Sequence, residues 1–443
     1  MTEHPVICSA PSPLLQRIKK TNYSRQYFHN ILCLERSERN GDTMGYTYEE
    51  TNKLLKKAIR IDASIENRIK DYSSIEGEFP LFGARAKGAY IWDVDDNRFI
   101  DFTMGYGTIL LGHADDRVNK AVVEEINRGT CLSPMWKNIQ IELGESLQRV
   151  IPNAERTFFM KTGSDATSGA VRLARCFTGR DKILRWGYNG WHDWATPRPM
   201  GVPEVIQQDV KKFDYNSLEK LEMYFSKYKN QIACVIMMPF ETELPSPGYL
   251  QSVQNITKRH GAVFILDEMR SGFRMAVGGA QEYFDIVPDL ATYSKAMANG
   301  YPISAITGKA EIFEYINRTK MTATYFNSSH EMAAALKTIE IIETTDLIDY
   351  IWKLGELFKN EMQKLINQYS ISAKMIGVAP MPYIEFDYGN TNEKIKRCFY
   401  GACARQGILF HPNHHWYISG AHRKEDIYNT LEICQDAFKQ IRR

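Results

Sequence analysis

The chain has 443 residues, of which 44% are hydrophobic and 24% charged, a composition typical of globular proteins rather than disordered ones. Lys plus Arg number 55 and Asp plus Glu 53, so the formal charge is only +2, which argues against nucleic-acid binding. No stretch approaches the roughly 18 uninterrupted apolar residues that span a bilayer. The first residues lack a signal-peptide pattern and the eight cysteines form no CxxC pair. We therefore predict a cytoplasmic protein that binds neither membrane nor nucleic acid.

The first part of the chain carries few structural signals. Residues 1–75 are polar and irregular apart from a helical pattern over 48–60, and we interpret them as an N-terminal extension. The segment AYIWDVDDNRFIDF then alternates apolar and polar residues about positions 94–97, which predicts a β-hairpin. Apolar residues at helical spacing predict a helix over 116–128.

The middle of the chain alternates apolar runs with amphipathic stretches. The apolar runs predict strands at 157–160, 233–238, 262–266, 290–293 and 303–307. The amphipathic stretches predict helices at 165–177, 217–228 and 250–259. This alternation indicates βαβ units, and therefore an α/β fold with a mostly parallel, buried sheet.

A long helical segment over 331–343 is followed by mixed helices and short strands. This change in pattern indicates a smaller α+β domain after the large one. The predicted organisation is an extension over 1–75, the first part of a small domain over 76–125, a large domain over 126–340 and a C-terminal small domain over 341–443.

Three loops at predicted strand ends contain residues that could carry chemistry. The first, Lys161 to Ala166, opens a helix with hydroxyls and a glycine, as phosphate sites do. Taken alone, capping of the helix by Ser164 or Asp165 explains it better. In the second loop, Asp267 directly follows an apolar run; it either caps the next turn or holds a protonated cofactor ring nitrogen.

The third loop contains Lys295, directly after the apolar run LATY. A lysine at a buried strand end can have a lowered pKa and act as a nucleophilic amine, although a lone loop lysine is usually solvated. The combination is more informative than its parts. Pyridoxal phosphate needs an amine to bind it covalently, an acid beside its ring nitrogen and a cradle for its phosphate.

At this point the sequence becomes recognisable. The segments that carry the likeness are RAKGAYIWDVDDNRFIDF, KTGSDATSGAVRLAR, FILDEMRSGFR, GGAQEYFDIVPDLATYSKAMANGYPISAITG and YISGAHRKEDI. In this order they resemble the class III aminotransferases, and most closely the glutamate-semialdehyde aminomutase branch, from about Leu81 to the C-terminus. The resemblance implies the pyridoxal-phosphate-dependent transferase fold of type I, with pyridoxal 5'-phosphate as the cofactor.

The resemblance also assigns roles to residues. It implies that Lys295 is the Schiff-base lysine and that Asp267 is the partner of the pyridine nitrogen, so these two are the predicted catalytic residues. The other predicted cofactor contacts are Thr162, Gly163 and Ser164 at the phosphate, Tyr188 stacked on the ring, Met269 packed against it, and Thr324 reaching the phosphate from the neighbouring subunit. This last contact implies a homodimer with shared active sites.

Several positions depart from the family pattern. Asn189 stands where the family has His, and Met238 replaces the Glu of a Glu-Pro pair. The branch's Ser-Pro-Val-Arg motif is absent, and positions 71–74 read Asp-Tyr-Ser-Ser instead. These changes concern substrate recognition, so we predict an aminotransferase with another substrate rather than the aminomutase.

The candidate substrate residues are Asn189, His414, His415 and Trp416. Adjacent histidines in a strand would point to opposite faces, so we predict no metal site. One of them facing the substrate and a merely packed or solvated imidazole are equally open interpretations. Arg270 has the chemistry of a carboxylate clamp, but the sequence favours a surface ion pair.

The predicted function is transfer of an amino group from an amino donor to a carbonyl acceptor through the Lys295 Schiff base. The acceptor could be a keto-sugar, a cyclitol or another specialised metabolite. Two alternatives stay open: an isomerase (aminomutase or epimerase) that uses the same cofactor, and a catalytically degenerate binding protein. The presence of both Asp267 and Lys295 argues against the second.

Overall fold

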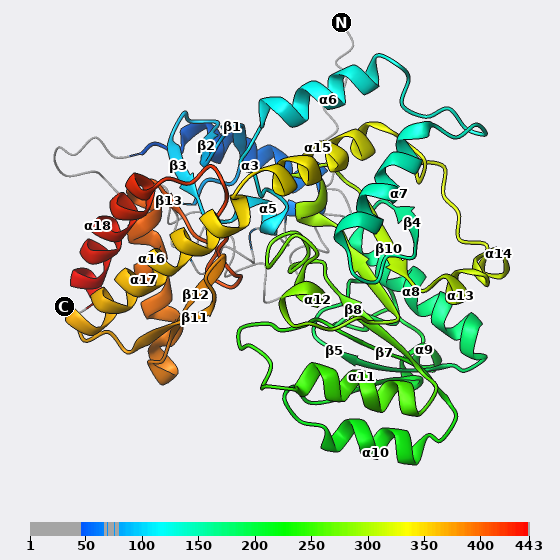
Figure 1. Cartoon of the computed structure of the whole chain (residues 1–443). Coiled ribbons are helices and arrows are strands. Elements are labelled where there is room, and N and C mark those ends of the chain that lie inside the picture. The colour runs from blue at the N-terminus through cyan, green and yellow to red at the C-terminus, as the bar shows by residue number, and fades with distance from the viewer. Residues whose placement is uncertain (1–45, 66–68, 70–74, 76–78, 442–443) are drawn as a thin grey trace, which may run out of the picture. The chain divides into compact units, whose positions relative to one another are not determined.

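The computed structural model describes residues 46–65, 69, 75 and 79–441, and Thr47 to Arg443 form one compact unit (Figure 1). Most of the predicted extension over 1–75, including positions 71–74, lies outside the described residues. The helical pattern over 48–60 is confirmed as α3 (Glu49–Ile61). No described helix combines the length and apolarity needed to cross a membrane.

A seven-stranded sheet forms the centre of the unit, in the order β4-β10-β9-β8-β7-β5-β6. Its strands are β4 (Arg156–Met160), β5 (Lys182–Trp186), β6 (Val210–Lys212), β7 (Ile232–Met237), β8 (Val263–Asp267), β9 (Leu290–Tyr293) and β10 (Ser304–Gly308). Strands β5 to β9 pair in parallel, whereas β10 is antiparallel to both β4 and β9. The predicted α/β fold with a mostly parallel sheet is confirmed.

Two strands of the seven-stranded sheet, β5 and β6, were not predicted, and β10 runs in a direction that the sequence pattern did not indicate. The segment Lys182–Trp186 mixes charged and apolar residues, and Val210–Lys212 is a short edge strand, so neither forms an apolar run. The connection from β9 to β10 holds only the 3₁₀-helix η1 (Lys295–Ala298). It is shorter than the roughly dozen residues that a parallel crossover needs, so β10 turns back.

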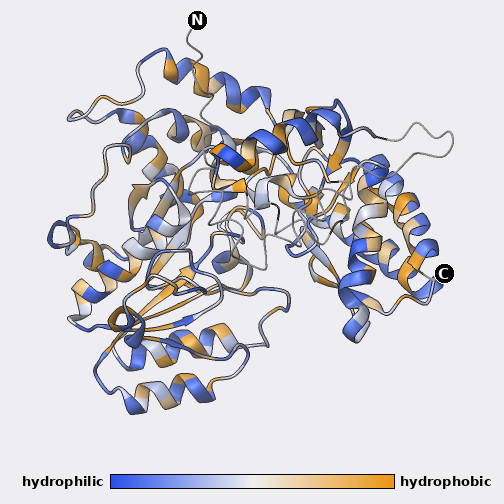
Figure 2. Cartoon of the chain, turned by 180° about the vertical axis from the view of Figure 1, so that it is seen from behind, coloured by the Kyte–Doolittle hydropathy of each residue, from blue (hydrophilic) through white to orange (hydrophobic). Residues whose placement is uncertain are grey.

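Helices cover both faces of this sheet. Within β8, Phe264 and Leu266 pack in the same apolar cluster as α11 (Tyr249–Arg259), whereas Val263 and Ile265 pack with α8 (Gly163–Thr178). Successive strand side chains point to opposite faces, so the two helices lie on opposite sides. The strands are accordingly among the most hydrophobic parts of the chain (Figure 2).

A four-stranded sheet lies beside this layer, in the order β1-β2-β3-β13. The predicted hairpin is confirmed by antiparallel pairing of β2 (Tyr90–Asp93) with β3 (Arg98–Asp101). At its turn, the backbone N–H of Asn97 donates to Asp93 Oδ1 at 2.8 Å. Strand β13 (Ile408–Leu409) is parallel to β3, which joins the C-terminal region to the first hairpin. The other strands are β1 (Gly83–Lys87) and the hairpin β11 (Ala373–Val378) and β12 (Met381–Phe386).

The other helical elements connect and cover these sheets. They are α5 (Met104–Gly107), α6 (Asp116–Ile126), α7 (Asn138–Val150), α9 (Glu204–Gln208), α10 (Glu219–Lys227), α12 (Ala280–Tyr283), α13 (Ala310–Phe313), α14 (Ile316–Thr319), α15 (His330–Thr344), α16 (Leu347–Gln368), η2 (Gly389–Thr391), α17 (Asn392–Arg405) and α18 (Lys424–Ile441). The predicted helices over 116–128, 217–228 and 331–343 correspond to α6, α10 and α15.

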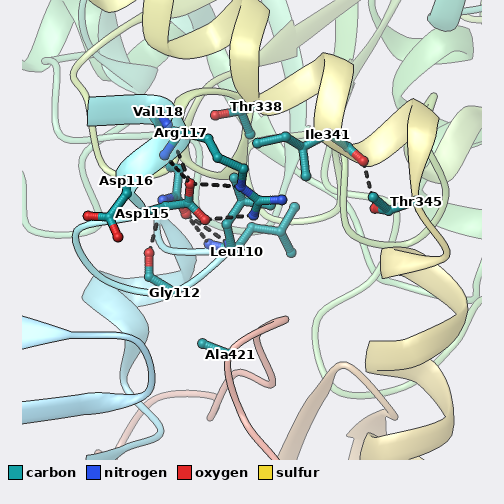
Figure 3. Close-up of polar contacts among 12 residues, drawn as sticks. Leu110, Gly112, Asp115, Asp116, Arg117, Val118, Thr338, Ile341, Thr345 and Ala421 are labelled. Atoms are coloured by element: carbon teal, nitrogen blue, oxygen red, sulfur yellow. Dashed lines mark hydrogen bonds and ion pairs between the residues drawn. The ribbon is translucent and has the colours of Figure 1, made fainter. Parts of the chain in front are cut away.

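Helix α6 shows how a local sequence signal fixes a helix start (Figure 3). The Asp115 side chain accepts from the backbone N–H groups of Arg117 at 3.0 Å and Val118 at 3.3 Å, which satisfies donors that the first turn leaves free. Arg117 also pairs with this carboxylate at 2.7 Å. A cavity of about 310 Å³ lies here, and none of the predicted site residues lines it.

Candidate active site

The candidate residues lie at one edge of the seven-stranded sheet. Strands β4, β5, β7, β8 and β9 run in the same direction, so the loops after their carboxyl ends meet there. Asp267, the last residue of β8, is paired in register with Thr292 of the neighbouring strand β9, and Lys295 follows β9. Open α/β sheets bind ligands in this position.

Asp267 is a buried carboxylate, with only 2% of its surface exposed. It accepts hydrogen bonds from Asn189 Nδ2 at 2.8 Å and from the Met269 backbone N–H at 3.2 Å. Burial raises the pKa of Asp267, and these hydrogen bonds together with the charge of Lys295 oppose the rise. Within the described part of the chain no side chain forms an ion pair with it. A buried carboxylate of this kind fits a cationic ligand atom, such as a protonated ring nitrogen.

Lys295 opens η1 with φ of 45°, a left-handed conformation that costs an L-residue roughly 1 kcal/mol. Neighbouring hydrogen bonds hold this loop: Ser294 Oγ donates to the Ile303 carbonyl at 2.7 Å, and the Leu110 N–H donates to Asn299 Oδ1 at 2.8 Å. Burial lowers the pKa of Lys295 to about 8, and the nearby charge of Arg270 adds to the effect. A larger fraction of this amine is therefore neutral and nucleophilic near neutral pH than of an ordinary, solvated lysine.

The loop before α8 presents a helix N-terminus to the same edge. Thr162 caps this 16-residue helix: its hydroxyl accepts from the Asp165 N–H at 3.1 Å, and Asp165 Oδ2 accepts from the Thr162 N–H at 2.8 Å. The structure thus confirms helix capping and the part of Asp165 in it, but the N-cap residue is Thr162 rather than Ser164. The helix N-terminus still offers backbone donors and a positive dipole end to a phosphate.

Two glycines allow the loops to pack closely. A Cβ atom at Gly190, where φ is 110°, would lie 2.5 Å from Ser164 Oγ. A Cβ at Gly163 would lie 2.9 Å from Met269 Sδ. Gly163, Ser164 and Met269 are therefore brought together with Asp267, as a site for one cofactor requires. The residues present fit pyridoxal phosphate.

The two remaining predicted cofactor residues, Tyr188 and Thr324, are exposed to solvent in the single chain. Tyr188 is 56% exposed next to the buried Asn189. Thr324 is exposed on the loop before α15, where its carbonyl accepts from Cys131 Sγ at 3.9 Å. Among the described residues, no hydrogen bond links Thr324 to the strand-end loops.

Two predicted substrate residues have different roles in the structure. Asn189 is buried and donates to Asp267, so its amide nitrogen serves the carboxylate rather than a substrate. Trp416 is fully buried and stacks on Phe410, with ring centroids 3.8 Å apart. It belongs to the hydrophobic core and lines no part of the site, because sequence alone does not separate a core aromatic from a pocket aromatic.

The two histidines lie near Lys295, but not in the predicted strand. They lie in an irregular segment after β13, so the expectation of opposite strand faces is wrong. His415 Nδ1 contacts Arg270 Nη1 at 2.8 Å, and the His414 ring packs edge-on against Tyr106 with centroids 5.2 Å apart. Burial and the charge of Lys295 lower the pKa of His414 to about 3, so this imidazole is neutral.

Two arginines of the β8 loop, Arg270 and Arg274, are not where the sequence pattern indicated or were not predicted from it. Arg270 is half-buried at the site rather than in a surface ion pair. Arg274 is completely buried and donates to the carbonyls of Ile418 at 2.8 Å and Gly107 at 3.1 Å. It thereby ties the α5 segment and the C-terminal loop to the β8 loop. The sequence signal that could have identified Arg270 and Arg274 is their position, three and seven residues after Asp267.

This sheet, with a buried aspartate and an activated lysine after adjacent strands and a helix N-terminus beside them, defines a pyridoxal-phosphate-dependent enzyme of fold type I. The family model described as "Aminotransferase class-III" matches residues 72–437, and the chain belongs to this family. The predicted family, fold and cofactor are thereby confirmed.

Individual relatives agree with this assignment. The chain is 36% identical over 384 residues to 3-aminobutyryl-CoA aminotransferase of Cloacimonas acidaminovorans (strain Evry), covering 84% of this chain and 92% of the relative. It is 30% identical over 426 residues to glutamate-1-semialdehyde 2,1-aminomutase of Persephonella marina (strain DSM 14350 / EX-H1), covering 89% and 99%. The pyridoxal-phosphate internal aldimine form of the FumI protein of Sphingopyxis sp. MTA144 superposes with a TM-score of 0.84 at 30% identity, covering 88% and 95%.

Proposed function

We propose that this aminotransferase moves an amino group from an amino donor to a carbonyl acceptor, with Lys295 and Asp267 as its catalytic residues. The observation that carries the proposal is the placement of these two side chains after adjacent parallel strands. When bound, pyridoxal phosphate supplies an electron-withdrawing ring that stabilises the negative charge left at a substrate carbon.

The two catalytic residues have distinct tasks. The Lys295 amine would hold the cofactor covalently and give way to a substrate amine, and the freed Nζ would move a proton as general base and general acid. The Asp267 carboxylate would keep the ring nitrogen protonated, and Asn189 orients that carboxylate through its 2.8 Å hydrogen bond.

The remaining residues bind and orient the cofactor. Thr162, Gly163 and Ser164 would surround its phosphate at the start of α8. Met269 would pack against one side of the ring and Tyr188 would stack on it, an arrangement that favours offset contact between aromatic faces. The exposed position of Tyr188 leaves its ring accessible to such a ligand.

The sequence departures and the relatives indicate which carbonyl compounds could accept the amino group. Keto-sugars, cyclitols and other specialised carbonyl compounds are proposed acceptors, because Met238 replaces the glutamate of the family pattern. The 36% identical relative is named for 3-aminobutyryl-CoA, which adds acyl thioesters with a 3-oxo group to the proposed acceptors. The relative named as an aminomutase, at 30% identity, supports an isomerase as the second candidate.

The distinguishing experiment supplies the holoenzyme with one amino donor at a time and follows cofactor absorbance and products. We expect one donor to convert the cofactor to its amine form and release one equivalent of carbonyl product. A carbonyl acceptor should then restore the starting spectrum and become aminated. Rearrangement of a single substrate without amino transfer to any added acceptor would contradict this proposal and favour the isomerase.

We also propose a homodimer in which Thr324 reaches the phosphate site of the partner. Large apolar side chains are exposed around this threonine: Met135 by 69%, Trp136 by 73% and Tyr325 by 67%. The two loops that carry them contact each other, because the Ser329 N–H donates to the Thr130 carbonyl at 2.9 Å. Exposed apolar clusters of this kind mark interaction surfaces, and a second copy is the occupant that would complete the site.

Trp136→Glu should therefore shift the protein from dimer to monomer in sedimentation velocity and weaken cofactor binding by about tenfold or more. Tyr428→Glu is the matched control, because Tyr428 is an exposed aromatic residue, at 51%, on the distant helix α18. A wild-type monomer with full cofactor affinity would contradict the shared site.

The proposed compartment is the cytoplasm. Six cysteines of the described residues are free thiols, and three of these are buried. Free thiols are typical of a reducing compartment.

A further inference from the structure

Arg270 is a half-buried guanidinium whose neighbours do not neutralise its charge. Nη1 contacts His415 Nδ1 at 2.8 Å, and Nη2 donates to the Phe240 carbonyl at 3.2 Å. Nη2 also lies 3.9 Å from Met238 Sδ. Among the described residues, no carboxylate forms an ion pair with Arg270.

The His415 contact fixes the orientation of Arg270 without cancelling its charge. A guanidinium can only donate, so Nδ1 must accept, and the imidazole is the neutral tautomer with its proton on Nε2. Burial and the charge of Arg270 hold the pKa of His415 well below its ordinary value, and the nearby Glu241 carbonyl opposes this only partly. His415, with 7% of its surface exposed, is therefore a neutral support for the positive charge.

Met238, which lies beside Nη2 of Arg270, carries no charge that could neutralise the guanidinium. The family resemblance places a glutamate at this position, but here a thioether faces Arg270. A thioether is a weak acceptor and carries no charge. The contacts of Arg270 with His415, Phe240 and Met238 are thus all to neutral groups, and none of them neutralises the guanidinium charge.

The charge of Arg270 acts on the reacting end of the site. It lowers the pKa of Lys295 more than any other single charge, and it also opposes the rise in the pKa of Asp267. Arg270 comes from the β8 loop, and His415 comes from the C-terminal region. A carboxylate bound by Arg270 would therefore lie within electrostatic reach of Lys295.

We propose that Arg270, oriented by His415, binds a carboxylate of the amino donor or of the matching keto acid. This inference rests on the proposed aminotransferase function and names the charged class of one substrate. The planar guanidinium matches the two oxygens of a carboxylate better than a single point charge would. Arg270 touches the substrate, whereas His415 is a positioning residue.

The test measures binding rather than turnover. Wild-type holoenzyme is titrated calorimetrically with straight-chain mono- and dicarboxylates of two to five carbons and with the amides of the same acids. At least one carboxylate should bind about 10- to 100-fold more tightly than its amide, the range expected for charge-assisted hydrogen bonds. Arg270→Gln should abolish this preference, and Arg270→Lys should restore only part of it.

Two further variants separate recognition from folding. Met238→Glu places a carboxylate beside Arg270 and should suppress carboxylate binding while leaving the guanidinium in place. His415→Asn keeps an acceptor that can orient Arg270, so it should retain more of the preference than His415→Leu, although both remove the imidazole. A merely structural histidine would not show this order.

Carboxylate binding by Arg270 and amino transfer by the holoenzyme can fail independently of each other. If wild-type holoenzyme transfers amino groups but the preference for carboxylates is absent, or persists in Arg270→Gln, the Arg270 assignment is overturned. If amino transfer fails while Arg270→Gln abolishes carboxylate binding, the anion site stands and the proposed reaction falls.

Discussion

Lys295→Ala is expected to lower kcat by about 10²- to 10⁴-fold or more, the loss associated with removing a general acid–base residue. The variant also removes the amine that holds the cofactor, so the visible absorption of the lysine-bound form should disappear. Folding should be preserved, because the substitution shortens a side chain whose backbone is fixed by neighbouring hydrogen bonds. Steady-state kinetics and absorption spectra of purified protein measure both effects.

The matched control is Lys309→Ala. Lys309 lies after β10 and pairs with Asp289 at 2.5 Å, so it is another lysine close to a strand end but paired with a carboxylate. We expect this variant to keep its activity and its spectrum. Equal losses in both variants would show that Lys295 acts only through stability.

The second large effect is expected for Asp267→Asn, which should lower kcat by about 10²- to 10³-fold, as removal of an electrostatic contact to the reacting centre does. A neutral amide does not hold a ring nitrogen protonated, although it still accepts the Asn189 hydrogen bond. The same variant should be more thermally stable than the wild type when both are cofactor-free. The two effects have opposite signs because the cofactor supplies the positive partner that the buried carboxylate lacks.

The stability gain expected for cofactor-free Asp267→Asn follows from the raised pKa of Asp267. Ionisation of an acid with a raised pKa costs folding free energy as pH increases above the value of the unfolded chain, which is about 4. The gain in Tm for Asp267→Asn should therefore be absent below pH of about 4 and grow towards neutral pH. Asp289→Asn is the control, because that carboxylate already has its Lys309 partner and should lose stability when neutralised.

Local sequence signals predicted much of the large sheet. The runs at 290–293 and 157–160 correspond to β9 and β4, because uninterrupted apolar segments have few alternatives to burial. Strand β5 was not predicted because charged residues interrupt its apolar run. Its place in the sheet depends on pairing with β6 and β7.

The site was predictable where chemistry coincides with a strand end. Asp267 and Lys295 were found because unusual residue types follow apolar runs. The roles of Asn189 and Arg270 were not, because their partners are distant in sequence: Asn189 contacts a residue 78 positions away, and Arg270 contacts one 145 positions away. Trp416 shows the opposite error, since its position beside two histidines suggested a site while its ring completes the core.

Chemical reduction of the holoenzyme identifies the lysine that carries the cofactor. Purified holoenzyme is reduced with borohydride, which makes the link between amine and cofactor permanent, and peptides are then mapped by mass spectrometry. We predict one pyridoxyl group per chain, on the peptide that contains Lys295, and none there in Lys295→Ala. Labelling of a different lysine, or no label in protein saturated with pyridoxal phosphate, would contradict the assignment of this residue and of the site around it.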